Sequence, residues 1–161
     1  EMCLNLMGKD LLDDTAHQFC IKLQQHILDR LISYQEETGV LFNFEATPAE
    51  STCYRLALID SKKCPDIITQ KNGNDVYYTN SCNIPVKSVT TITDMLKNQE
   101  SLQTMFTGGV VSHLYFEGAI SGEQAKSIIR SSFTNTRIPY ESISPISRYC
   151  PTHKYIKEMV D

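Results

Sequence analysis

The segment from Thr47 to Ser51 has the residue types of a helix N-terminus that receives an anion. Thr47 and Glu50 have the spacing of a capping box, and Pro48 stands at the first helical position, where its missing N–H costs nothing. The N–H groups of Ala49, Glu50 and Ser51, with the nearby hydroxyls, suit a phosphate at the positive end of the helix dipole. Glu50 brings a negative charge and occupies one donor, so a capped structural helix is the alternative.

A second polar cluster runs from Tyr77 to Ser81 and contains two tyrosines followed by three hydrogen-bonding side chains. It suits the wall of a pocket that contacts a polar ring or a sugar, and an ordinary polar strand end is the alternative. His113 follows a Gly108-Gly109 pair, which lets the backbone approach another segment closely. We interpret His113 as a hydrogen-bonded core residue rather than a catalyst.

Cys150 and His153 have the spacing of half a zinc knuckle. A structural zinc site needs four ligands, and no second pair follows within the 161 residues, so this motif is incomplete. The six cysteines show no regular spacing and no Cys-x-x-Cys pair. We therefore expect a cytoplasmic protein whose other thiols are small apolar core residues.

The remaining pattern indicates helices and strands in alternation, which is typical of an α/β fold with buried strands. Asp13 and Asp14 favour the start of the first helix, and Gly39 is a plausible stop for it. We expect helices over residues 12–34, 47–60, 91–105 and from 121 onward, and strands or extended segments over 40–46, 76–80, 83–87, 107–116 and 138–144. Asn72-Gly73 predicts a turn.

Composition narrows the function classes. A net charge of −4 argues against general nucleic-acid binding, and no apolar run approaches a membrane span. A chain of 161 residues is one domain or a piece of a larger one. Because Glu1 is not an initiator methionine, we expect a piece of a longer chain.

Five segments resemble, in order and over nearly the whole chain, the anaerobic (class III) ribonucleoside-triphosphate reductases. They are "YQEETGVLFNFEATPAESTCYRLALID", "CPDIIT", "YYTNSCNIPV", "LQTMFTGGVVSHLY" and "IPYESISPISRYCPTHKYI". The resemblance implies part of the ten-stranded α/β barrel of glycyl-radical enzymes over residues 1–148. Residues 149–161 then begin a truncated C-terminal zinc-binding and glycyl-radical region.

The resemblance also implies the chemistry of the family. Its members reduce ribonucleoside triphosphates to 2′-deoxyribonucleoside triphosphates by glycyl and thiyl radical chemistry, many with formate as reductant. An activating iron–sulfur protein that uses S-adenosylmethionine installs the glycyl radical, and allosteric nucleotides regulate a homodimer.

Residue by residue, the resemblance assigns substrate contacts to Thr47, Ala49, Glu50, Ser51, Tyr78 and Asn80, and half of a structural zinc site to Cys150 and His153. The thiyl cysteine and the radical glycine match no position here, so we expect no catalytic residue in this piece and no activity from it alone. The alternatives are a non-catalytic nucleotide-binding or assembly module, which should dimerise or aggregate through exposed edges, and another glycyl-radical enzyme.

Overall fold

A computed structural model of the chain describes residues 1–88, 91–146, 148–150 and 154–156, and only the backbone at 50, 87, 117, 146, 148–150 and 154–156. The helices are α1 (Met2–Met7), α2 (Asp14–Thr38), α3 (Glu50–Lys63), α4 (Ile92–Gln103) and α5 (Gly122–Asn135), with a 3₁₀ turn, η1, at Val86–Ser88. The strands are β1 (Gln70–Asn72), β2 (Asp75–Tyr77), β3 (Ser112–Glu117), β4 (Glu141–Ile146), β5 (Arg148–Cys150) and β6 (Lys154–Ile156). Helices and strands therefore mix as the sequence predicts.

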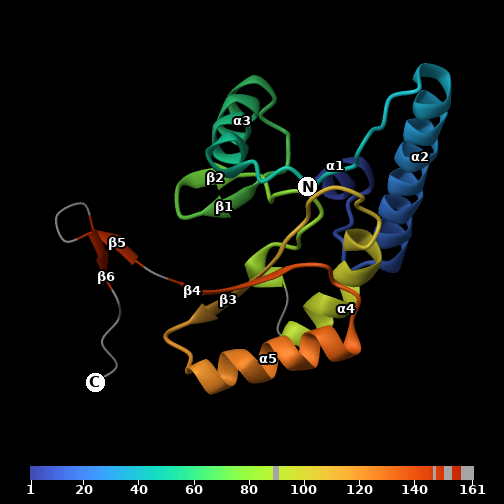
Figure 1. Cartoon of the computed structure of the whole chain (residues 1–161). Helices are drawn as coiled ribbons and strands as arrows, with labels where there is room; N and C mark the ends of the chain where they lie inside the picture. Colours follow the sequence, from blue (N-terminus) through green and yellow to red (C-terminus); the bar gives the residue numbers. More distant parts are fainter. Residues whose placement is uncertain (89–90, 147, 151–153, 157–161) are drawn as a thin grey trace.

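The described strands form three separate two-stranded sheets, so the structure contains α/β elements but no ten-stranded barrel within the described residues. Strands β3 and β4 are parallel, with Ser112 opposite Glu141, and α5 forms the crossover between them. This is a βαβ unit, the expected building block of an α/β layer. Figure 1 shows α5 lying along one side of the β3–β4 pair, next to α4.

The principal apolar core lies between this unit and α4. Leu96 of α4, Leu114 of β3 and Ile138 before β4 are all buried and form one cluster. Ile128 of α5 packs against the cluster, whereas Phe133 on the same helix is half exposed. The apolar face that the sequence predicts for α5 is therefore only partly covered.

Local capping explains where three helices begin or end. The Asp13 carboxylate accepts the N–H groups of Thr15 and Ala16 at the start of α2, and Gly39 ends that helix with a φ of 69°. Thr91 caps α4, and Ser121 with Gln124 forms a complete capping box on α5. These boundaries confirm the predictions, because each cap depends on residues close in sequence.

A second unit contains α3 and the antiparallel β1–β2 hairpin, on which α3 lies (Figure 1). Asn72 pairs with Asp75, and Gly73 adopts a left-handed φ of 62°, which confirms the predicted turn. Residues 83–87 were expected to be extended, but part of this segment forms η1 instead. Proline at position 85 precedes that turn, and the Ser88 N–H donates to its carbonyl.

The predicted buried strand at 40–46 is wrong. No strand forms there, and the side chain of Leu41 is 89% exposed. The backbone of segment 40–46 instead forms hydrogen bonds with the loop before β3. The Gly108 N–H donates to the Phe44 carbonyl at 2.8 Å, and the Ala46 N–H donates to the Gly109 carbonyl at 2.8 Å. With a loop rather than a strand beside it, the segment stays extended without joining a sheet.

Among the described residues, none of the helices is both long enough and apolar enough to cross a membrane.

Candidate functional site

A cavity of about 370 Å³ lies between the α3–hairpin unit and the α4–β3 layer. Its size falls in the range of small-molecule sites. The residues that give it chemical character are Cys53, Tyr77, Tyr78, Thr79, Asn80 and His113. Four of these six belong to the polar cluster that the sequence analysis singled out.

Asn80 links this cavity to the N-terminus of α3. Its Oδ1 accepts the backbone N–H of Ala49 at 3.1 Å and the thiol of Cys53 at 2.9 Å. The predicted cap at Thr47 is wrong, because α3 begins at Glu50 with Ala49 as its N-cap and no capping side chain of its own. An amide from a distant segment supplies the acceptor that a local cap would otherwise provide.

The side chain of Tyr78 points toward α3 and attaches the cavity wall to that helix. The phenol donates to Oδ2 of Asp60 at 2.9 Å, and the Tyr78 N–H donates to the Cys53 carbonyl at 3.4 Å. Desolvation and then the hydrogen bond to Asp60 raise the pKa of Tyr78 to about 12. A tyrosine held in this way is a fixed neutral donor at physiological pH.

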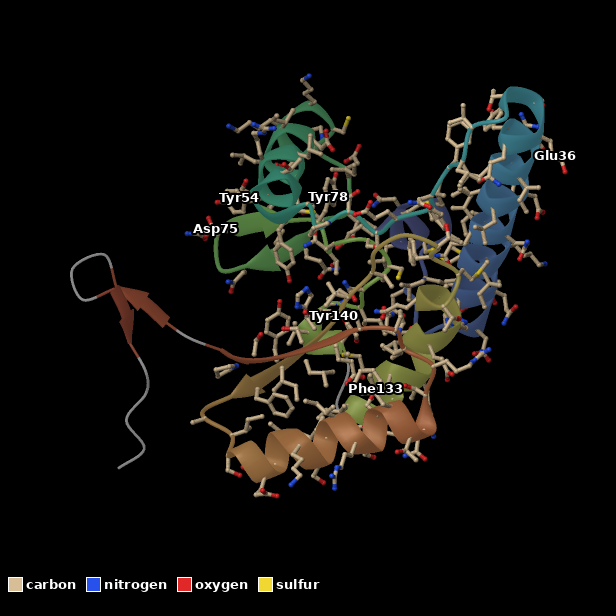
Figure 2. All side chains as sticks on the ribbon, in the orientation of Figure 1. Glu36, Tyr54, Asp75, Tyr78, Phe133 and Tyr140 are labelled. Carbon is tan, nitrogen blue, oxygen red and sulfur yellow. The ribbon has the colours of Figure 1, made fainter. Side chains whose placement is uncertain are left out.

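A second tyrosine makes a similar link at the other edge of the unit. The Tyr54 phenol donates to Oδ1 of Asp75 at 2.8 Å, and this hydrogen bond raises the pKa of Tyr54 above its ordinary value. Figure 2 shows Tyr54 and Asp75 side by side between α3 and the hairpin. The tyrosine–aspartate pairs thus bind α3 to the hairpin at two points.

Thr79 is held from the opposite side by α1. Both its N–H and its hydroxyl donate to Oε1 of Glu1, at 3.1 and 2.8 Å. Ser81, two residues later, has a left-handed φ of 51°, which is uncommon for a residue other than glycine. The chain from Tyr78 to Ser81 is therefore fixed from two directions, as a preformed binding wall requires.

His113 and Tyr115 form the opposite wall. Their rings are stacked, with centroids 5.8 Å apart and an interplanar angle of 22°, and both line the cavity. His113 was expected to be a hydrogen-bonded core residue, but it is only half-buried and faces the cavity. The alternation along the strand already predicts that His113 and Tyr115 share one face, but it does not show that this face lines a cavity.

The structure brings together only some of the predicted contacts. Tyr78 and Asn80 line the 370 Å³ cavity, whereas Thr47 lies on a neighbouring cavity of about 950 Å³ that Tyr78 shares. Ala49 is half-buried at the start of α3, and Ser51 is exposed one residue into the helix. The side chain of Glu50 lies outside the described part of the chain.

Comparison with known proteins decides the family. A sequence model of the family "Anaerobic ribonucleoside-triphosphate reductase" matches residues 1–161, the whole chain. The chain belongs to this family. It is also similar to an anaerobic ribonucleoside-triphosphate reductase of Haemophilus influenzae, with 28% identity over 103 residues. That match covers 63% of this chain and 14% of the length of the relative.

Family membership confirms the resemblance found in the sequence. The chain spans only a small part of the reductase that it matches. The cavity wall from Tyr77 to Asn80 is thus a feature of a chain that belongs to this family and matches a small part of its relative.

The predicted metal ligands lie in the C-terminal part of the chain. His153 and the side chain of Cys150 are outside the described residues. The backbone shows that β5 and β6 pair antiparallel, with Cys150 opposite Lys154. Elsewhere, the described residues contain no group of three or more histidine, cysteine, aspartate or glutamate side chains suited to a metal ion.

Proposed function

We propose that this chain forms part of the substrate pocket of an enzyme that reduces ribonucleoside triphosphates to 2′-deoxyribonucleoside triphosphates. The observation that carries the proposal is the joining of the 370 Å³ cavity to the N-terminus of α3 through Asn80. A helix N-terminus attracts phosphate groups, and an aromatic wall suits a nucleoside. Both features meet at one place in a chain of the reductase family.

In this proposal the triphosphate lies against the first turn of α3. The Ala49 N–H donates to Asn80, and the Thr52 N–H donates to the Ala49 carbonyl at 2.8 Å, so the N–H groups of Glu50 and Ser51 are the ones left for a phosphate. The hydroxyls of Thr47 and Ser51 are both exposed, so a ligand can reach them. The nucleoside then extends toward Tyr78 and Asn80, and the residues act by positioning the ribose.

The radical chemistry is assigned to other parts of the enzyme. By resemblance to the family, the thiyl cysteine and the radical glycine lie outside these residues, so we propose that the 161 residues alone are inactive. The same resemblance supports formate as reductant, an iron–sulfur activating protein, allosteric nucleotides and a homodimer.

Cys150 and His153 are proposed to hold a structural zinc ion together with a second ligand pair. The antiparallel pairing of Cys150 with Lys154 supports this, because the two strands on either side of the motif form a hairpin, as in a zinc knuckle. Zinc would supply folding free energy to this hairpin and take no part in the reduction.

Steady-state kinetics of the natural protein test the phosphate site. The double variant Thr47→Val, Ser51→Ala should raise KM for ribonucleoside triphosphates roughly tenfold with little change in kcat, because it removes two hydroxyl donors from the phosphates. Ser61→Ala is the matched control, since Ser61 lies in the last turns of the same helix and bonds only to the Leu58 carbonyl.

An unchanged KM for every ribonucleoside triphosphate would contradict the assignment of the phosphate site to the N-terminus of α3. Nucleotide binding by the natural protein without any turnover under anaerobic conditions with formate would instead favour a non-catalytic nucleotide-binding module.

A further inference from the structure

Two cysteine thiols meet between α1 and α2, away from the residues assigned to substrate. The Sγ atoms of Cys3 and Cys20 lie 3.3 Å apart, and the Cys3 thiol also lies 3.9 Å from the Ala16 carbonyl. Both cysteines are free thiols in the structure. Nothing in the proposed substrate contacts uses either of them.

The pair can be reached from solvent. Cys3 is only 4% exposed, but Cys20 is half-buried, and both line the cavity of about 950 Å³ described above. A small reagent that enters this cavity therefore meets the Cys20 thiol first. Cys3 then needs no exposure of its own, because it can react with a group already carried by Cys20.

We propose that Cys3 and Cys20 are a reversible disulfide-forming pair, whose oxidation joins α1 covalently to α2. A disulfide has an S–S bond of about 2.05 Å, so the two sulfur atoms must approach by about 1.3 Å from their separation in the structure. Side-chain rotation can supply a movement of this size. The two helices are already in contact here and need not be brought together.

The oxidant is a low-molecular-weight disulfide, and the exchange balances. Burial and the neighbouring Cys3 thiol raise the pKa of Cys20 to about 12, so its thiolate is a minor species at neutral pH and the exchange is slow there and faster at alkaline pH. After losing its proton to solvent, the Cys20 thiolate attacks one sulfur of the reagent, forms a mixed disulfide and expels one small thiolate. The Cys3 thiolate then attacks the Cys20 sulfur, forms the protein disulfide and expels the second small thiolate. The protein loses two electrons and two protons, and the reagent is reduced to two thiols.

The consequence extends through α1 to the wall of the candidate site. The Glu1 carboxylate, two residues before Cys3, accepts both hydrogen bonds of Thr79. Asn5, two residues after Cys3, exchanges two hydrogen bonds with the backbone of Ile68 at 2.8 and 2.9 Å. Fixing Cys3 to α2 therefore restrains both links between α1 and the α3–hairpin unit.

Peptide mapping of the natural protein tests this proposal without any substitution. The reduced protein is incubated with oxidised glutathione, alkylated with iodoacetamide and digested with trypsin. Cys3 lies in the peptide that ends at Lys9, and Cys20 lies in the peptide from Asp10 to Lys22, so a disulfide links two separate peptides. We expect this linked pair, two hydrogen atoms lighter than its parts, and its loss after reduction.

Single variants assign the link. Cys3→Ser and Cys20→Ser should each abolish it, whereas Cys64→Ser, at an exposed cysteine outside the cavity, should leave it unchanged. Hydrogen exchange of the Thr79 amide should slow at least severalfold in the oxidised protein. Two alkylated, unlinked peptides in the wild-type digest would overturn the proposal, as would a link from Cys20 to Cys82, which lines the same cavity.

Discussion

One side-chain oxygen of Asn80 joins the start of α3 to the wall of the candidate site. That atom accepts the Ala49 N–H and the Cys53 thiol, and the residue itself lines the candidate site. A single amide therefore sets where α3 begins and where the cavity wall stands. Because a helix start normally depends on a neighbouring side chain, this long-range cap makes the site sensitive to one distant residue.

Removing the Asn80 acceptor should destabilise the protein. We expect Asn80→Ala to lower the free energy of unfolding by about 1–2 kcal/mol, since the N-terminus of α3 loses its acceptor. Asn80→Asp is the matched control, because it keeps an acceptor oxygen and adds a charge favourable at a helix N-terminus. Urea denaturation measures both. Equal stability of Asn80→Ala and wild type would show that water replaces the cap.

The raised pKa of Tyr78 predicts a loss of stability at alkaline pH. The folded value is about 12 against an ordinary value of 10.0, so the native state binds more protons between these two values. The stabilising contribution of Tyr78 is complete below pH 10 and is lost as pH rises toward 12. Tyr78→Phe should make the free energy of unfolding fall less steeply in this window.

Denaturation across that pH window measures the difference between the two proteins. Tyr140→Phe is the matched control, because Tyr140 is 61% exposed. The hydrogen bond to Asp60 belongs to Tyr78 and stays intact in this variant. If the free energy of unfolding falls equally with pH in Tyr78→Phe and in wild type, the pKa of Tyr78 is not raised by folding.

At the scale of elements, the extended segment around Phe44 is fixed by the loop that precedes β3. Thr107 and Gly108 both donate to the Phe44 carbonyl, at 3.0 and 2.8 Å. The rings of Phe44 and Phe106 lie 4.5 Å apart. This contact holds the chain that leads into α3, and it depends on the absence of a side chain at Gly108.

Gly108→Ala should destabilise this contact, and Gly109→Ala should not. A Cβ at position 108 would lie 3.0 Å from the Glu45 Cβ and 3.3 Å from the Phe44 carbonyl oxygen. At position 109 the nearest atom, Glu45 Oε1, is 3.5 Å away, an ordinary contact. We expect a loss of about 1–3 kcal/mol for Gly108→Ala alone, measured by thermal or urea unfolding. Similar losses for both variants would contradict the close approach.

The elements that the sequence predicts correctly depend on near neighbours. The cap at Thr91, the capping box at Ser121 and the stop at Gly39 each involve residues within one helical turn. The start of α3 was predicted wrongly because its acceptor, Asn80, is 31 residues from Ala49. Periodicity and capping patterns carry no information about such a partner.

The residues of the candidate site also fall into those that the sequence could identify and those that it could not. The cluster from Tyr77 to Ser81 was identifiable because its aromatic and polar residues are consecutive, and the structure places four of these five on the 370 Å³ cavity. His113 comes from β3, on the other side of that cavity, and its sequence context gives no indication of the partner wall. Only the packing of the α3–hairpin unit opposite β3 brings the two together.

At the scale of the whole molecule, several helices leave part of their apolar faces exposed among the described residues. Large apolar side chains are exposed on four of the described helices, including Leu6 of α1, Ile32 of α2, Leu56 of α3 and Phe133 of α5. These open apolar faces fit the proposal that the chain functions within a larger barrel.

The unit of α3 and the β1–β2 hairpin is continuous in sequence, and this has a consequence for local unfolding. The hydrogen bond from Tyr54 to Asp75 lies within the unit. The hydrogen bond to Asp60 comes from Tyr78, the residue that directly follows the hairpin. Among the described residues, the hydrogen bonds of Asn5 and Glu1 join the unit to α1 and the residue before α1. The unit can therefore open as one cooperative segment while the β3–α5–β4 unit stays folded. A ligand that contacts both walls of the cavity would suppress that opening. Binding at the site would therefore slow the hydrogen exchange of the α3 amides.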